Sequence, residues 1–81
     1  KVLLEKEKNI IKLVVEGVNI QEFAYYVYLD GKKIFTEWYQ EKNYFEYRAE
    51  KAGKYSFRVF AKNREEKKVS VGTQYMEIEG L

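Results

Sequence analysis

The sequence predicts an all-β domain of about seven short antiparallel strands packed as two sheets. Several segments alternate apolar and polar residues with the period of two expected of half-buried strands, and no segment sustains a helical period. Turn-forming residues separate these segments at intervals near the roughly 8–12 residues typical of sandwiches and barrels. A small five-stranded barrel of the oligonucleotide-binding type fits a similar pattern and is the alternative fold.

The clearest strand runs from Tyr55 to Lys62, and Ile10 to Glu16 forms a second one. Successive side chains of a strand point to opposite sides, so alternate residues share a face. We expect the core-facing residues to be Tyr55, Phe57, Val59 and Ala61 in the first strand, and Ile11, Leu13 and Val15 in the second.

A third strand, from Phe23 to Leu29, is apolar on both faces and is therefore expected at the centre of its sheet. The dipeptide Asp30-Gly31 follows it. Both central positions of a type I′ turn need a positive φ, which Asp and Gly tolerate. The sequence therefore predicts a hairpin from this strand into a fourth strand, Lys33–Trp38.

The remaining segments complete the strand pattern. A short edge strand is expected at Val2–Leu4, a polar break at Gln40–Asn43, a strand at Tyr44–Arg48, a charged loop at Asn63–Lys68 and a last strand at Val69–Ile78. Gly72 lies inside that last strand, where a glycine marks a bulge or splits the strand.

Length and composition limit the function. At 81 residues the chain forms one domain, residues 1–81, which we expect to be part of a larger multidomain protein. It has no His and no Cys, so the usual nucleophile–base pairs, disulfides and thiolate metal sites cannot form. Its glycines lie at separate turns and match no phosphate-binding loop. We therefore expect no enzyme activity, no cofactor and no metal.

Charge and hydropathy exclude two further kinds of partner. The 15 Lys and Arg residues and the 13 Asp and Glu residues give a net charge of +2 spread along the chain, which is weak support for nucleic-acid binding. No apolar run approaches the roughly 20 residues that cross a bilayer, so we expect no membrane insertion. As an isolated domain the chain is expected to be monomeric.

The segment Ala52-Gly53-Lys54-Tyr55-Ser56-Phe57 has the pattern Ala-Gly-x-Tyr-x-apolar. In immunoglobulin-like domains a Tyr at this position forms the tyrosine corner, in which its hydroxyl bonds to main chain a few residues upstream. Tyr55 is the expected corner residue, Gly53 supports its turn, and Gly31 supports the hairpin. The alternative is that Tyr55 is an ordinary core aromatic.

With Tyr28-Leu29-Asp30-Gly31, Thr36-Glu37-Trp38 and the continuation to Asn63, this segment resembles the three-Y domain, the triple-tyrosine domain of two-component regulators. The resemblance covers Phe23 to Asn63, with Ala52 where the family usually has Pro. It implies an immunoglobulin-like or fibronectin-like β-sandwich that serves as an accessory domain in bacterial sensor or cell-surface proteins. It also implies an extracytoplasmic location, periplasmic or on the cell surface.

One surface is a candidate interaction site. In an immunoglobulin-like fold the strands Phe23–Leu29 and Tyr55–Lys62 are neighbours, and their outward residues form an aromatic patch with a cation inside it. The candidate residues are Tyr26, Tyr28, Arg58 and Phe60, with Trp38 or Tyr39 from the next strand depending on register.

Three interpretations of this patch are open. The tyrosines can simply pair across strands under the stems of Lys33, Lys62 or Gln74 and stabilise the sheet. The patch can dock a neighbouring domain or another protein, since Tyr and Arg are favoured at interfaces. It can also bind glycans, because flat aromatic rings stack on sugar faces.

Overall fold

The structure is a computed structural model that describes residues 1–17 and 19–79. Among these residues, eight strands form two antiparallel sheets, one of three strands and one of five. The three-stranded sheet contains β1 (Val2–Glu7), β2 (Ile10–Val15) and β5 (Tyr44–Arg48). The five-stranded sheet contains β3 (Ile20–Leu29), β4 (Lys32–Gln40), β6 (Gly53–Asn63), β7 (Lys68–Gly72) and β8 (Met76–Ile78).

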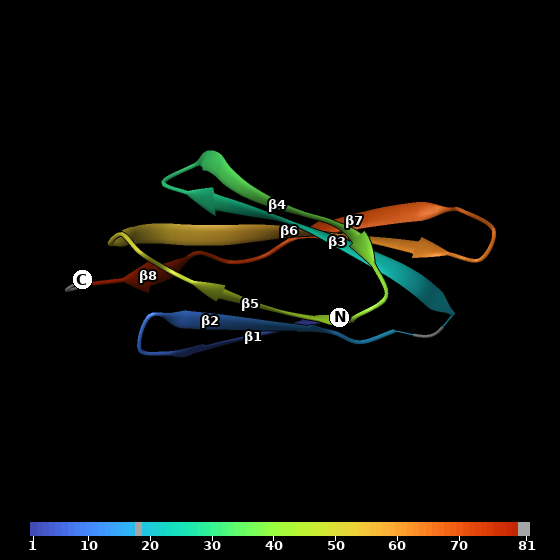
Figure 1. Cartoon of the computed structure of the whole chain (residues 1–81), viewed down its shortest axis with the longest axis horizontal. Helices are drawn as coiled ribbons and strands as arrows, with labels where there is room; N and C mark the ends of the chain where they lie inside the picture. Colours follow the sequence, from blue (N-terminus) through green and yellow to red (C-terminus); the bar gives the residue numbers. More distant parts are fainter. Residues whose placement is uncertain (18, 80–81) are drawn as a thin grey trace.

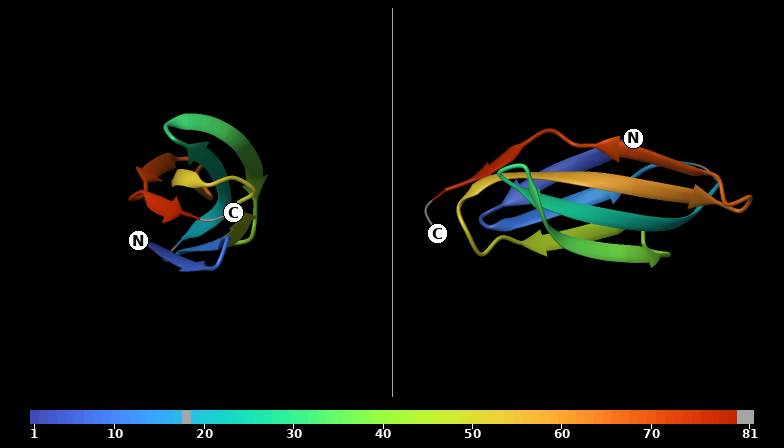
Figure 2. Two further views of the ribbon diagram at one scale, coloured as in Figure 1. Left: turned by 90° about the vertical axis from the view of Figure 1, so that its left-hand side faces the viewer. Right: turned by 90° about the horizontal axis from the view of Figure 1, so that it is seen from above.

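The two sheets lie face to face as the layers of a β-sandwich (Figure 1). The three-stranded sheet has the order β1-β2-β5, and the larger sheet has the order β4-β3-β6-β7, with β8 also paired to β6. Figure 2 shows the two layers end-on and the strands of the larger sheet side by side from above. The predicted sandwich is confirmed, and the alternative of a closed five-stranded barrel is wrong because the strands form two separate sheets.

The core lies between the sheets and consists of the residues that the period of two assigned to it. Every predicted core residue of β2 and β6 is buried, and the inner face of β3 adds Phe23, Tyr25 and Val27. Leu29, on the same face of β3 as these three residues, is partly buried and packs against the core. The remaining buried members of the core cluster are Ala49 and Ile78. Burial of alternate residues on facing sheets supplies the hydrophobic free energy of the domain.

The predicted hairpin joins β3 to β4. Asp30 has a φ of 51° and Gly31 a φ of 85°, the positive values that a type I′ turn requires. The Asp30 carboxylate also accepts a hydrogen bond of 3.0 Å from the main-chain N–H of Lys54, and the Asp30 N–H donates to the Lys54 carbonyl at 2.8 Å. The turn is thereby attached to the start of β6.

Tyr55 forms the predicted tyrosine corner. It is buried, and its hydroxyl donates a hydrogen bond of 2.7 Å to the carbonyl of Lys51, four residues upstream. Gly53 lies between the two with a φ of 148°, and a Cβ at this position would lie 2.6 Å from Leu29 Cδ1. Glycine is therefore needed here for both backbone conformation and space.

The predicted last strand is split into two strands after Gly72, one of the two outcomes that a glycine at this position predicts. β7 pairs with residues 58–62 of β6 and β8 with residues 53–55, while the intervening residues 73–75 belong to neither strand. The described part of the chain has no helix with the length and apolar character needed to cross a membrane.

Candidate functional site

Four of the five predicted patch residues meet on the outer face of the five-stranded sheet. β3 and β6 are neighbours, as expected, and their register places Tyr26 opposite Arg58. Ala24 lies opposite Phe60, and Tyr28 opposite Ser56. Because successive side chains of a strand point to opposite sides, these residues face away from the core, although Ala24 is itself buried on this face.

The rings on this face pack against one another. Tyr26 and Phe60 form an edge-to-face pair with ring centroids 4.7 Å apart, and Tyr26 and Tyr28 form a second at 6.4 Å. The Lys33 ammonium lies over the Tyr26 ring, 4.2 Å from its centroid. As a result Tyr26, Tyr28 and Phe60 are only partly exposed, whereas Arg58 is exposed.

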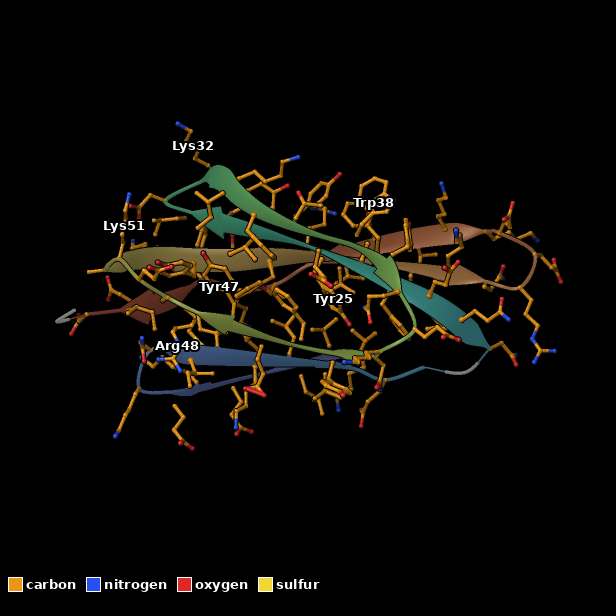
Figure 3. The ribbon with its side chains drawn as sticks, viewed as in Figure 1. Tyr25, Lys32, Trp38, Tyr47, Arg48 and Lys51 are labelled. Carbon is orange, nitrogen blue, oxygen red and sulfur yellow. The ribbon has the colours of Figure 1, made fainter. Side chains whose placement is uncertain are left out.

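A bulge in β4 brings the fifth residue, Trp38, to the same face. Phe23 pairs with Gln40 but Tyr25 pairs with Glu37, so two residues of β4 oppose one residue of β3. Those two residues are Trp38 and Tyr39, and they oppose the outward-facing Ala24. The Trp38 ring lies on the outer side of the sheet in Figure 3 and is 67% exposed.

Tyr39 lies beside Trp38 on this face, with ring centroids 5.9 Å apart and planes at 80°. The Lys62 ammonium lies 4.6 Å above the centroid of the Tyr39 ring and forms a salt bridge of 3.1 Å with Glu22. The hydrogen bond to Glu22 is the main cause that raises the pKa of Lys62. The sequence predicted that either Trp38 or Tyr39 would extend the patch, and the bulge places both residues on this face.

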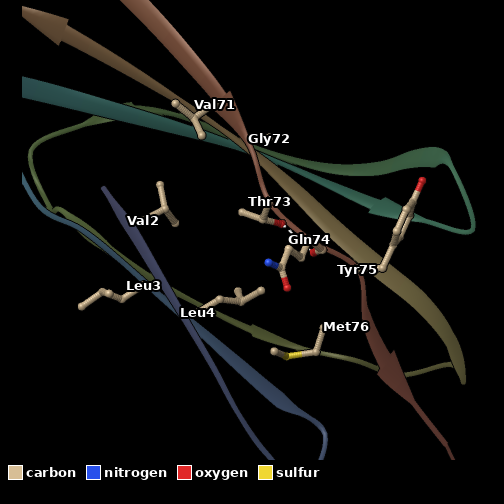
Figure 4. Close-up of a pocket in the computed structure, with 9 residues that line it drawn as sticks. All are labelled: Val2, Leu3, Leu4, Val71, Gly72, Thr73, Gln74, Tyr75 and Met76. Atoms are coloured by element: carbon tan, nitrogen blue, oxygen red, sulfur yellow. Dashed lines mark hydrogen bonds between the residues drawn. The ribbon is translucent and has the colours of Figure 1, made fainter.

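We call this surface the outer aromatic face. Its members are Tyr26, Tyr28, Trp38, Tyr39, Arg58 and Phe60, with Lys33 and Lys62 above the rings. The predicted cover by lysine stems is present for Lys33 and Lys62. Gln74, the third predicted cover, instead lines a groove of 400 Å³ between β1 and residues 71–76 (Figure 4).

The tyrosines of the inner face have a different environment. The Tyr25 hydroxyl donates a hydrogen bond of 3.0 Å to the carbonyl of Lys42, and the Tyr25 ring stacks on Phe45 at 4.9 Å. The pKa of Tyr25 is raised to about 12. Burial is the largest cause; a hydrogen bond with the Gln40 side chain lowers the pKa by a smaller amount, and the charge of Glu37 raises it. The pKa of Tyr47 is also raised, mainly by burial and then by Tyr55 and Glu50.

The acidic residues that lie close together in the sequence are on the surface of the domain. The neighbouring acids Glu5 and Glu7, and Glu65 and Glu66, are all exposed, and Glu65 lies 3.8 Å from Lys67. No group of three or more His, Cys, Asp or Glu side chains with metal-binding geometry occurs in residues 1–17 and 19–79.

The outer aromatic face can act by contact. Its rings provide apolar surface, its cations provide hydrogen-bond donors, and the β-sheet beneath holds both in place. Tyr75, at the rim of this face, was missed by sequence reasoning and is 66% exposed. It lies between β7 and β8, in a segment where the alternation of apolar and polar residues does not indicate which side chains face the core.

A family model described as the Y_Y_Y domain matches residues 17–79. This match extends beyond the Phe23–Asn63 resemblance and includes both halves of the split last strand. No curated protein and no solved structure gives a significant match to the chain.

Proposed function

The chain belongs to the Y_Y_Y domain family, and from this premise we propose that it is an accessory docking module of a bacterial sensor or cell-surface multidomain protein. The Y_Y_Y domain is a non-catalytic module found in two-component sensor proteins, typically in their periplasmic regions. In this proposal the chain is one domain of such a protein, lies outside the cytoplasm, and contacts a neighbouring domain or another protein.

The observation that supports docking most is the exposure of Trp38 on a face that also carries tyrosines and an arginine. Trp, Tyr and Arg are the residues that most often dominate the energy of protein interfaces. A tryptophan that is 67% exposed keeps a large apolar surface in water, and a protein contact would bury it. The partly buried rings of Tyr26 and Phe60 pack against each other on the same face.

The test compares two exposed aromatic residues on opposite sides of the sandwich. Trp38 lies on the outer face of the larger sheet, and Tyr44, 51% exposed, lies at the start of β5 in the smaller sheet. The binding partner is the remainder of the parent protein, prepared separately, and its affinity for the 81-residue chain is measured by calorimetry. We expect Trp38→Ala to weaken binding at least tenfold, about 1.4 kcal/mol, and Tyr44→Ala to leave it unchanged. Equal effects, or a loss only with Tyr44→Ala, contradict the proposal.

Carbohydrate binding is the second candidate function. It is favoured by the two most open rings of this face and its rim, Trp38 and Tyr75, which are 67% and 66% exposed. In this case the isolated chain binds cell-wall or polysaccharide fragments, and their addition shifts the NMR signals of Trp38, Tyr26, Tyr28 and Phe60. Unchanged spectra with such fragments leave docking as the function.

A further inference from the structure

A hollow of 380 Å³ opens at the rim of the outer aromatic face, between β3, β6 and residues 72–75. Its walls include the rings of Tyr28 and Tyr75, the hydroxyl-bearing Ser56 and the guanidinium of Arg58. In Figure 4 the Tyr75 ring is directed away from Leu4 and Met76, toward the opposite side of the segment from the groove. The hollow and the groove share Gly72, Thr73 and Tyr75 as a common wall, and their other lining residues differ.

The hollow lies where β6, on the edge away from β3, has no strand partner between β7 and β8. β7 ends at Gly72 and β8 begins at Met76. Between them Thr73 still bonds to β6, because its N–H donates to the Phe57 carbonyl at 2.8 Å and its Oγ1 accepts from the Phe57 N–H at 2.9 Å. Gly72 also makes room for Arg58, since a Cβ at Gly72 would lie 3.2 Å from Arg58 Nη2. A side chain at position 72 would thus press on the guanidinium.

Arg58 is a charged group with unused hydrogen-bonding capacity. Nη1 donates to Ser70 Oγ at 3.2 Å, which uses one of the five N–H donors of a guanidinium. Among residues 1–17 and 19–79 the salt bridges are Lys62–Glu22 and Lys67–Glu65, and neither includes Arg58. An exposed planar fork of this kind matches a carboxylate, which accepts two parallel N–H bonds.

The positive charge of the outer aromatic face, of which the hollow is the rim, also favours an acidic partner. Lys33 and Lys62 lie over rings of the same face, and Lys68 lies 5.9 Å from the Tyr39 centroid. Two acidic residues nearby are already engaged: Glu22 is bound by Lys62, and the Asp30 carboxylate, next to Gly31 of the hollow, accepts a hydrogen bond from the Lys54 main-chain N–H. A surface with this potential is complementary to an acidic protein surface, and such complementarity determines partner choice and association rate.

The ring faces favour a protein over a sugar as the source of the carboxylate. Stacking of a sugar needs an open ring face, which Tyr75 offers at this hollow, but on the adjoining face Lys33 covers Tyr26 and Lys62 covers Tyr39. An acidic side chain needs no open ring face and can bind the guanidinium from the rim. We propose that the hollow at Arg58 binds an Asp or Glu carboxylate of an acidic partner protein, an inference that rests on the docking function above.

The test is an NMR titration of the whole 81-residue chain with three probes. The first is the capped peptide acetyl-Glu-Tyr-Glu-amide, the second is its uncharged analogue acetyl-Gln-Tyr-Gln-amide, and the third is trigalacturonate. We expect the acidic peptide to shift the amide signals of Arg58, Gly72 and Tyr75. Its affinity should exceed that of the uncharged peptide by about tenfold, equivalent to about 1.4 kcal/mol.

Two variants make the test specific. Arg58→Gln removes the guanidinium and should abolish the preference for the acidic peptide, and Arg58→Lys should restore it only in part because the fork is lost. Arg48→Gln, the same change on the exposed side of β5 in the other sheet, should have no effect. Retention of the preference in Arg58→Gln would overturn the inference.

The other outcomes separate this inference from the docking function. Shifts confined to Trp38 and Tyr39, equal for both peptides, reject the carboxylate site and leave docking in place. Tighter binding of trigalacturonate than of the acidic peptide rejects a protein partner and supports the glycan function. Shifts that depend on chain concentration without any probe identify a second copy as the occupant and reject the inference, and unchanged spectra with all probes reject it as well.

Discussion

The two central strands of the larger sheet, β3 and β6, carry aromatic residues on both faces and use them differently. On the inner face Tyr25 and Tyr55 are buried, and each donates its hydroxyl to a main-chain carbonyl. On the outer face the rings lie under lysine ammonium groups or in water. The inner tyrosines therefore fix connections between the sheets, and the outer aromatics remain available for contact.

The largest expected difference between the faces comes from truncating a phenylalanine on each. Phe57 is 1% exposed on the inner face of β6, and Phe60 is partly exposed on its outer face. Phe57→Ala should lower the free energy of unfolding by about 3–5 kcal/mol because it leaves a cavity. Phe60→Ala should lower it by about 0.5–1.5 kcal/mol, the value of an aromatic pair. Urea denaturation followed by circular dichroism measures both, and equal losses would show that the outer rings are also core.

The second expected effect is a loss of stability at high pH through Tyr25. Its folded-state pKa of about 12 lies above the ordinary value of 10.0, so the folded state holds this proton more tightly than the unfolded state. The resulting stability is present below pH 10 and is lost as the pH rises through 12, amounting to about 2–3 kcal/mol.

Tyr25→Phe isolates this effect from the other tyrosines and the lysines. The variant should be less stable than the parent chain at pH 8 because the hydrogen bond to Lys42 is lost, and the difference should shrink between pH 10 and 12. Denaturation curves across this range provide the measurement. A constant difference would show that Tyr25 does not titrate in this way.

The third effect concerns the tyrosine corner. Tyr55→Phe keeps the ring and removes the bond to the Lys51 carbonyl, so it should cost about 1–3 kcal/mol of unfolding free energy. The same change at Tyr28, on the outer face, should stay within about 0.5 kcal/mol. If Tyr55→Phe leaves the unfolding free energy almost unchanged in thermal and urea unfolding, the corner hydrogen bond does not stabilise the domain.

Much of this fold could be predicted from residue periodicity and turn chemistry. The alternation in β2 and β6 identified the core faces, the apolar character of both faces of β3 identified it as a central strand, and Asp30-Gly31 identified the hairpin. Tyr55 and Gly53 identified the corner. These features depend on a residue and its near neighbours, which is why a single sequence contains them.

The candidate site could be predicted only in part. The outward positions of Tyr26, Tyr28, Arg58 and Phe60 follow from the period of two. The β4 bulge, which adds both Trp38 and Tyr39, depends on how β4 pairs with β3, and no local pattern encodes that register. The placement of lysines over rings and the bond from Tyr25 to Lys42 depend on side-chain geometry across strands.

The smallest expected effect on stability is at the most exposed aromatic. Trp38→Ala should change the free energy of unfolding by less than about 0.5 kcal/mol, because the ring makes few contacts to lose. Tyr44→Ala serves as the control on the other sheet. A loss above 2 kcal/mol for Trp38→Ala would assign Trp38 to the fold and weaken the docking proposal.

The most direct test of docking is hydroxyl-radical footprinting of Trp38, with mass-spectrometric readout, in the isolated chain and in the intact parent protein. Tyr44 is the internal reference, since it is exposed on the other sheet. We expect rapid labelling of both residues in the isolated chain and strong protection of Trp38, with Tyr44 unchanged, in the parent protein or its complex. Equal labelling of Trp38 in both states would contradict the assignment of the outer aromatic face to docking.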